Sequence, residues 1–374
     1  MVDLEVYQRA GAAVRRGEPI YEDGGTRLVF TYPPFAALVA AVVAPIRGWW
    51  GQFLWTVATI AALAGVVWLS FRPLFDRCRS EWRPLAVGAV LTVAVLSHPM
   101  IEHVFYGQVN VFLVLLCLLD VLARNRRWPL GVLTGVATAL KLTPGVFIVY
   151  FLVTDRRRAA LTATATAVAC TAVAALVVPS ASVDFWTREV FEGERIAGAV
   201  GYTSNQSLLG VAARLAPNQL GTALWLLLAV AVAGIGSVRA RDAFRSGDER
   251  GGVALMSLLA VLLSPIAWIH HFVWFVPALG AIVADGRDRR RLVVAAVIAA
   301  VLCLRLPWWG WALLDEGAAA GPLGVVLHNA YALLALGVLI AYPTRAGSDR
   351  DVPITSAHGR ARRNRTGRAL PAGS

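Results

Sequence analysis

One lysine stands out in a sequence whose other cationic side chains are all arginine. Lys141 is the only lysine among 35 lysine and arginine residues. It lies in the stretch ATALKLTPG between two apolar runs, where insertion scales put the cost of a cation at about 2.5–3.5 kcal/mol. Such a lysine either extends its ammonium group to the interface or faces a cavity and a partner. Because Leu140, Leu142 and Pro144 offer no charged partner, the sequence favours a site that binds an anion.

The carboxylate of Asp3 is a second candidate for chemistry. Asp3 heads a stretch whose apolar residues, at positions 4, 6, 7, 10 and 14, share one face of a helix. Gly17 and Pro19 end this predicted helix. A carboxylate beside a membrane-facing cavity can act as a general base toward a sugar hydroxyl. A solvated charge near the N-terminus explains the same residue without a catalytic role.

Polar side chains also gather where apolar runs begin. Glu102, Gln108 and Asn110 lie at the mouth of a predicted helix over 103–123, and the two amides can donate to and accept from sugar hydroxyls. Hydrogen bonds between helices would explain the same residues. The polar loop 180–207 carries Tyr202 and Asn205 and is typical of acceptor-binding loops, although Asn205 would also serve as a cap of the next helix.

Two adjacent histidines, His270 and His271, follow a Ser-Pro pair. Adjacent residues point to different sides of a helix, so they cannot bind one metal as an i, i+4 pair does. One of them could donate to a phosphate while the other packs in the core. The four cysteines are scattered singly in apolar segments. The sequence therefore predicts no metal site and no cofactor.

Composition identifies a polytopic membrane protein. The 374 residues are 57% hydrophobic and only 16% charged, with a mean hydropathy of +0.62, whereas soluble proteins carry about 25% charged residues. The net charge of +12 does not predict a nucleic-acid partner, because the arginines form short clusters between apolar runs. The positive-inside rule places these clusters in the cytoplasm: 72–83, 124–127, 156–158, 239–250 and 287–291.

The expected fold is all-α, with about 11–12 apolar helices. The runs 129–140 and 144–154 are too short for the ~20 residues of a full span. They form a re-entrant pair or one helix broken at Thr143-Pro144, which must line protein or a cavity. We expect three parts. They are a non-cytoplasmic amphipathic loop with the catalytic acidic residue Asp3, 1–29, a transmembrane domain, 30–341, and a disordered basic cytoplasmic tail, 342–374. All the polar motifs fall at the non-cytoplasmic ends, which favours a single site there.

The ordered set of motifs resembles glycosyltransferase family 87, the actinobacterial polyprenol-phosphate-mannose-dependent α-(1→2)-mannosyltransferases of GT-C type. The resemblance covers roughly residues 1–285 and rests on DLEVYQRAGAAVRRGEPIYE, FTYPPFAALVAAVVAP, YGQVNVFLVLL, GVATALKLTPGVFIVYFL, YTSNQSLLG and SPIAWIHHFVW. Members of the family carry a transmembrane helix before the acidic loop. This chain opens on a polar stretch instead, so we expect an upstream apolar segment to be missing from the reading frame.

The resemblance implies a multi-pass enzyme of the bacterial plasma membrane with its active site on the non-cytoplasmic face. The donor would be a polyprenyl-phosphate-linked mannose in the bilayer, and transfer to a mannolipid or another cell-envelope glycan would invert the configuration. Asp3 would remove the proton of the acceptor hydroxyl, and Lys141 with one of His270 or His271 would bind the donor phosphate. The predicted sugar- and acceptor-binding residues are Glu102, Gln108, Asn110, Tyr202 and Asn205.

Two alternatives remain open from the sequence. A secondary transporter would also have broken helices and charges at membrane depth, but no inverted internal repeat is visible and the polar motifs gather at one face. A related enzyme of the same scaffold would transfer a different lipid-linked sugar, such as arabinose or glucose.

Overall fold

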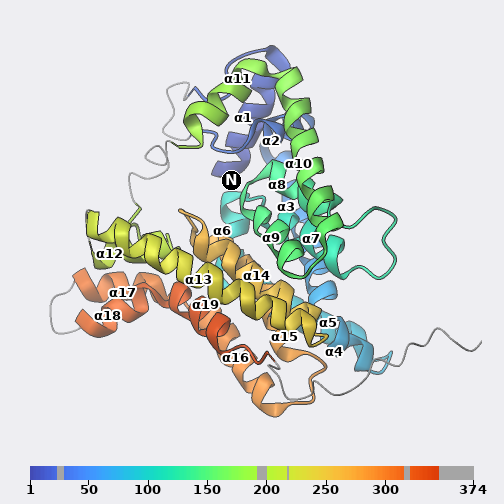
Figure 1. Ribbon diagram of the computed structural model, residues 1–374, viewed down its shortest axis with the longest axis vertical. Helices are drawn as coiled ribbons and strands as arrows, with labels where there is room; N and C mark the ends of the chain where they lie inside the picture. The colour runs from blue at the N-terminus through green and yellow to red at the C-terminus, as the bar shows by residue number, and fades with distance from the viewer. Residues whose placement is uncertain (23–28, 192–199, 217–218, 316–320, 345–374) are drawn as a thin grey trace, which may run out of the picture.

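The computed structural model of the protein consists of α-helices (Figure 1). It describes residues 1–22, 29–191, 200–216, 219–315 and 321–344. Within these residues the β-structure is a single isolated bridge, between Asn205 and Trp268. The predicted all-α, polytopic class is confirmed. Most of the predicted tail, 345–374, lies outside the described residues.

The helices follow one another along the chain with short connections. The first ten α-helices are α1 Val2–Arg16, α2 Pro34–Val43, α3 Gly48–Ser70, α4 Arg72–Arg77, α5 Arg83–Leu96, α6 His98–Tyr106, α7 Asn110–Leu122, α8 Val132–Leu140, α9 Val146–Val153 and α10 Arg157–Val177. The others are α11 Pro179–Asp184, α12 Leu208–Leu215, α13 Gln219–Arg245, α14 Glu249–Leu263, α15 Phe275–Val283, α16 Arg289–Cys303, α17 Leu306–Asp315, α18 Gly321–His328 and α19 Ala330–Ala341. Two short 3₁₀ helices, η1 Thr143–Gly145 and η4 Ile269–Trp274, precede α9 and α15.

Among the residues that the structure describes, three helices are each long and apolar enough to cross a membrane: α3, α10 and α13. Three bent pairs also qualify if each pair is one span, namely α5 with α6, α16 with α17, and α18 with α19, with bends of 70°, 55° and 68°. Pro99 and Pro307 lie in the first turns of α6 and α17, where a residue without a backbone N–H is tolerated. The described residues contain nineteen α-helices, and such breaks raise this number above the predicted 11–12 apolar helices, which include short broken ones.

One predicted helix is wrong in its extent. The run 103–123 is two helices, because α6 ends at Tyr106 and α7 begins at Asn110. Gly107 between them has φ 78°, a left-handed conformation that glycine adopts without strain. The predicted break near Thr143-Pro144 is confirmed: α8 ends at Leu140 and η1 begins at Thr143.

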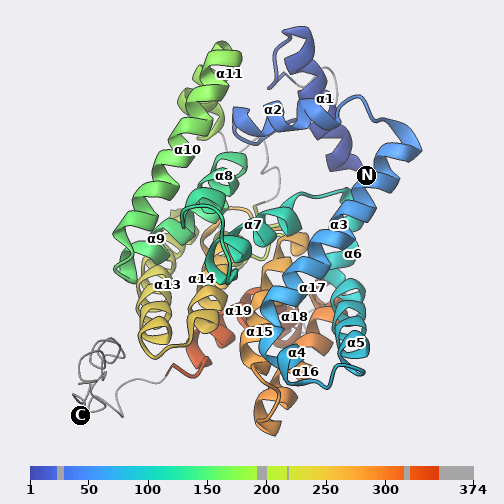
Figure 2. The same cartoon turned by 90° about the vertical axis from the view of Figure 1, so that its right-hand side faces the viewer.

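The basic clusters gather at one end of the helices. Contacts join clusters that are distant in sequence: Arg124 pairs with Asp76, Arg156 with Glu249 and Arg245 with Asp155. Arg77 donates to the Asp285 carbonyl at 3.2 Å, and Arg250 lies close enough to Arg72 and Arg124 for their charges to interact. At the opposite end lie α1, α2 and α11, together at the top of both views (Figures 1 and 2). The grouping of the arginine clusters that the sequence predicts is therefore present in the fold.

The amphipathic helix predicted near the N-terminus is α1, and it packs tightly on α2. Gly17 ends it with φ 68°. A Cβ atom at Gly11 would lie 2.4 Å from the backbone carbonyl of Ala40, so only glycine permits this approach. The Gln8 Nε2 group donates to the Ile46 carbonyl at 2.6 Å. These contacts fix α1, and therefore Asp3, relative to the membrane helices.

Candidate active site

A cavity of about 470 Å³ lies where α1, the α6–α7 connection and the α8–η1 break meet. Its walls include the side chains of Asp3, Gln108, Lys141 and His271. These four residues come from four segments of the chain, separated by up to 268 positions. The fold thus brings together the predicted base, the predicted cation and two predicted binding residues.

Asp3 is held by a hydrogen bond from Gln108. The Gln108 Nε2 group donates to the Asp3 Oδ2 atom at 2.5 Å. Burial raises the pKa of Asp3 above its ordinary value of 3.8, and the Gln108 hydrogen bond and the positive charge of Lys141 oppose this rise only in part. A carboxylate with a raised pKa accepts a proton more readily than an exposed aspartate does.

Gln108 is the centre of a hydrogen-bond network. Its Oε1 atom accepts from Asn110 Nδ2 at 3.2 Å and from the hydroxyls of Tyr7 and Tyr32, both at 3.4 Å. Because the Oε1 end of the amide accepts these three bonds, its Nε2 end faces Asp3 and donates to it. Asn110 itself is buried and connects this network to Lys141.

The ammonium group of Lys141 has neutral partners. Its Nζ atom donates to Asn110 Oδ1 at 3.1 Å, contacts His271 Nε2 at 3.2 Å and lies 5.1 Å from the centre of the Tyr32 ring. Among the described residues no carboxylate is within 4.0 Å of it. Burial lowers the pKa of Lys141 to about 7. In its protonated form the group has three donors and two hydrogen-bonding neighbours, so it retains one donor for a group that enters the cavity.

A buried carboxylate anchors the helix that carries Lys141. The Asp120 Oδ2 atom accepts from the backbone N–H groups of Gly131 and Thr134, both at 3.0 Å, at the start of α8. Its Oδ1 atom accepts from Trp128 Nε1 at 3.2 Å. Asp120 therefore fastens one end of α8 to α7, and the Lys141–Asn110 bond fastens the other. A carboxylate at a helix N-terminus also complements the helix dipole.

The structure separates the two histidines. Helix η4 turns His271 toward the cavity and the Lys141 ammonium group. His270 packs its ring 5.5 Å from that of Tyr106, and both its nitrogens are buried without a hydrogen-bond partner. Of the two, His271 is the one that an anion in the cavity could reach.

Three predicted acceptor-binding residues lie elsewhere. Glu102 pairs with His98 at 3.1 Å, and Tyr202 packs its ring on those of Trp268 and Trp308. Neither they nor Asn205 line the cavity.

Asn205 organises the loop before α12. Its Oδ1 atom accepts from the N–H groups of Ser207 and Ala267, at 3.2 and 3.0 Å. The expected alternative, that Asn205 caps the next helix, is wrong: Ser207 caps α12, and its hydroxyl accepts from the Gly210 N–H group at 3.0 Å. Serine is a preferred residue at such a position.

Tyr7 and Tyr32 are site residues that the sequence did not reveal. Both line the cavity and bond to Gln108, and their hydroxyls are 3.0 Å apart. The helical pattern places Tyr7 on the apolar face of α1, but its hydroxyl extends into the cavity and bonds to Gln108. In the described part of the chain, no three His, Cys, Asp or Glu side chains lie close enough to hold a metal ion.

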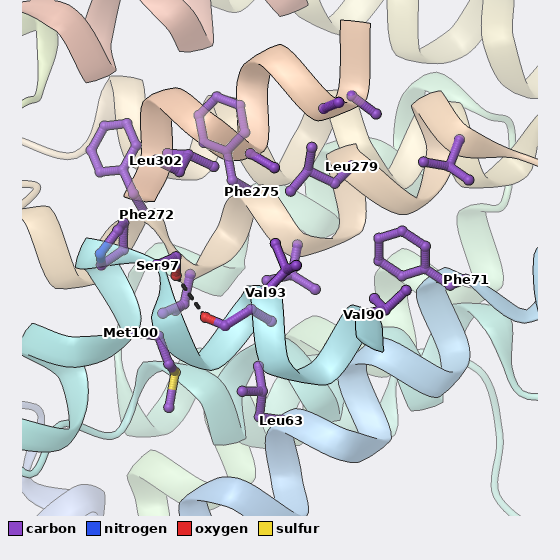
Figure 3. Close-up of a pocket in the computed structure, with 18 of the residues that line it drawn as sticks. Leu63, Phe71, Val90, Val93, Ser97, Met100, Phe272, Phe275, Leu279 and Leu302 are labelled. Carbon is purple, nitrogen blue, oxygen red and sulfur yellow. Dashed lines mark hydrogen bonds between the residues drawn. The ribbon is translucent and has the colours of Figure 1, made fainter. Parts of the chain in front are cut away.

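A second cavity, of about 280 Å³, is lined almost entirely by apolar side chains (Figure 3). Leu63 of α3, Val93 of α5 and Leu302 of α16 face into it, together with Phe272 of η4. Helix η4 is therefore a wall shared by both cavities, with His271 on the polar side and Phe272 on the apolar side.

The helices and the polar cavity define a multi-pass membrane protein with the side chains of an enzyme for group transfer. The sequence model of glycosyltransferase family 87 matches residues 30–265. The chain belongs to this family, as its motifs predict, and is a membrane glycosyltransferase.

Relatives with assigned activities align over most of the chain. A polyprenol-phosphate-mannose-dependent α-(1-2)-phosphatidylinositol mannoside mannosyltransferase of Mycobacterium tuberculosis is 32% identical, over 81% of this chain and 75% of the relative. A protein of the same description from Mycolicibacterium smegmatis is 33% identical, over 84% and 77%. A phosphatidylinositol pentamannoside mannosyltransferase of M. smegmatis is 31% identical, over 83% and 73%. No solved structure matches the chain significantly.

Proposed function

We propose that the enzyme transfers mannose from a polyprenyl-phosphate donor to a mannosylated phosphatidylinositol lipid and forms an α-(1→2) linkage with inversion. The names of the relatives support both substrates. The observation that carries the proposal is the pairing of a base and a cation in one cavity, where Asp3 and Lys141 both line the wall. Such a cavity suits a reaction that removes one proton and releases one anion.

In the proposed mechanism Asp3 takes the proton of an acceptor hydroxyl as the hydroxyl oxygen attacks the anomeric carbon of the donor. The bond between that carbon and the phosphate oxygen breaks, and the phosphate leaves with the electron pair. Lys141 and His271 stabilise the charge that develops on the phosphate. Gln108 orients Asp3 and the sugar hydroxyls, and Asn110 holds Gln108 and Lys141 in place. The acceptor-binding roles of Glu102, Tyr202 and Asn205 remain predictions.

We assign the cavity to the non-cytoplasmic face. The support is the gathering of the arginine clusters at the opposite end of the helices, since such clusters favour the cytoplasmic side. The apolar cavity behind η4 would accommodate part of a hydrophobic chain close to a phosphate bound at His271. A lipid-linked donor has both a hydrophobic chain and a phosphate.

Reconstitution tests the proposed function. Purified protein in lipid vesicles, supplied with polyprenyl phosphomannose and a phosphatidylinositol mannoside, is expected to form a product one hexose heavier that an α-(1→2)-mannosidase reverts. A product only with polyprenyl-linked glucose or arabinose would contradict the choice of sugar. Uptake of a solute into the vesicles without any transfer would favour a transporter.

The pH dependence of kcat/KM should report the ionisation of Asp3. Transfer is expected to fall as pH decreases through the pKa of this group, which burial raises above 3.8. The Gln108 hydrogen bond lowers that pKa, so Gln108→Leu should raise it and move the acid limb of the profile to higher pH. The measured quantity is the pH at which kcat/KM falls on the acid side of the profile, rather than the maximal rate. A limb that stays in place or moves to lower pH would contradict the assignment of Asp3.

A further inference from the structure

A second polar hollow, of about 290 Å³, lies between the end of α1 and the connection from α2 to α3. Three arginines line it: Arg15, Arg16 and Arg47. Arg16 is engaged with Glu18 through two hydrogen bonds, of 2.7 and 2.6 Å. In the described part of the chain, Arg15 and Arg47 have no carboxylate within 4.0 Å. Two unneutralised guanidinium groups thus border one hollow.

The two sides of this hollow are fixed to each other. Gln8 of α1 bonds to the carbonyl of Ile46, the residue before Arg47. Four positions after Gln8, Ala12 lines the hollow opposite Ala44 and Pro45, and the close approach at Gly11 leaves α1 little freedom to shift. The backbone positions of Arg15 and Arg47 are therefore set by packing, and both side chains are exposed at the rim of the hollow. Guanidinium groups present donors in a planar fork that matches the oxygens of a phosphate.

The aromatic residues that follow Arg47 place the hollow at the membrane interface. Trp49, Trp50 and Phe53 begin the span α3, and they remain 65%, 62% and 46% exposed. Exposed tryptophans at the end of a span are typical of the headgroup level of a bilayer. Figure 2 shows α1 and α2 at this end of α3. An anion at the headgroup level is most often a lipid phosphate.

We infer that Arg15 and Arg47 bind the phosphodiester of an anionic glycerolipid and that, in the reaction proposed above, this lipid is the anchor of the acceptor. The inference rests on the proposed function. Arg15 follows Asp3 by twelve residues on one helix, which corresponds to ~18 Å along its axis. A lipid held by its phosphate at Arg15 would extend its glycan along α1 toward the base. This separation is longer than a single hexose, so it favours acceptors that already carry several sugars.

The lipid site can be tested without turnover. Purified full-length protein in detergent is titrated with phosphatidylinositol, phosphatidylcholine or soluble inositol 1-phosphate, and its Tm is measured. Phosphatidylinositol is expected to raise the Tm of the wild type but not that of Arg15→Gln/Arg47→Gln. Arg290→Gln, an exposed arginine at the start of α16, serves as the control and should respond as the wild type does. Arg16→Gln should respond nearly as well, because Glu18 already engages Arg16.

Three results would overturn the inference. Phosphatidylinositol could raise the Tm of the double variant as much as that of the wild type, or phosphatidylcholine could stabilise the wild type as much as phosphatidylinositol does. Equal stabilisation of the wild type by inositol 1-phosphate would show that the site does not need the lipid chains. In transfer assays, Arg15→Gln/Arg47→Gln should raise the KM for the lipid acceptor about tenfold with kcat unchanged, as for the loss of charge-assisted contacts near solvent. A soluble mannoside without phosphate should be used equally by both proteins. If the wild type transfers no mannose, the proposed function fails, while the lipid titration still decides the arginine site.

Discussion

Asp3→Asn is expected to lower kcat about 10²–10⁴-fold, the range that a positioned general base contributes. Asparagine keeps the size of the side chain and can still bond to Gln108, but it cannot accept the proton of the acceptor hydroxyl. The KM of both substrates should change little, because the shape of the cavity is preserved. Initial rates of mannose transfer at saturating donor and acceptor measure the effect.

Glu5→Gln provides the matched control for Asp3→Asn. Both carboxylates lie in the first turn of α1, but Glu5 is exposed, whereas Asp3 lines the cavity. If Asp3 were only a solvated charge near the N-terminus, Asp3→Asn and Glu5→Gln would have the same small effect on turnover. Wild-type turnover in Asp3→Asn would therefore exclude the role of base and favour the solvated-charge reading.

Stability separates a catalytic loss from misfolding. Burial raises the pKa of Asp3 in the folded protein, so the folded state favours the neutral carboxyl and loses this stabilisation as pH rises through the folded pKa. Above that pKa the ionised group opposes folding, and Asp3→Asn removes that effect. The Tm of the variant at pH 7 should equal or exceed that of the wild type. A lower Tm would show that the variant disturbs the packing of α1.

Local patterns in the sequence predict the elements of this fold well. The spacing of apolar residues gives α1, and Gly17 ends it where the glycine adopts φ 68°. Thr143-Pro144 marks the break after α8 because proline cannot continue a helix and favours its first turn. Apolar runs and arginine clusters predict the spans and the end at which the clusters gather.

The composition of the site depends on contacts that no local pattern contains. The bond between Asp3 and Gln108 joins residues 105 positions apart, and the contact between Lys141 and His271 joins residues 130 positions apart. Helical periodicity predicts that His270 and His271 diverge, but it cannot say which of them faces the cavity, since that depends on how η4 packs. A polar residue such as Asn205 can bind a ligand or organise a loop, and only its bonding partners distinguish the two.

Lys141→Met should lower kcat about 10²–10³-fold, as expected when one group that stabilises developing negative charge is removed. Methionine fills a similar volume without the charge. The effect should appear in kcat and in weaker inhibition by the released polyprenyl phosphate, because the ammonium binds the phosphate most strongly once it has left the sugar. The KM for the acceptor should be nearly unchanged. Turnover and product inhibition equal to the wild type would exclude the phosphate role.

Comparison with Asn110→Leu distinguishes a catalytic lysine from a structural one. This variant retains the cation but removes its 3.1 Å bond and the bond from Asn110 to Gln108. If Lys141 acts only by holding α7 and α8 together, Asn110→Leu should impair transfer at least as much as Lys141→Met does, because both variants break this connection and Asn110→Leu also removes the bond to Gln108. If Lys141 acts on the leaving phosphate, Lys141→Met should be the more severe and should alone weaken product inhibition. Lys141→Arg should restore activity only in part, since a guanidinium does not fit the space between Asn110, His271 and the Tyr32 ring as an ammonium does.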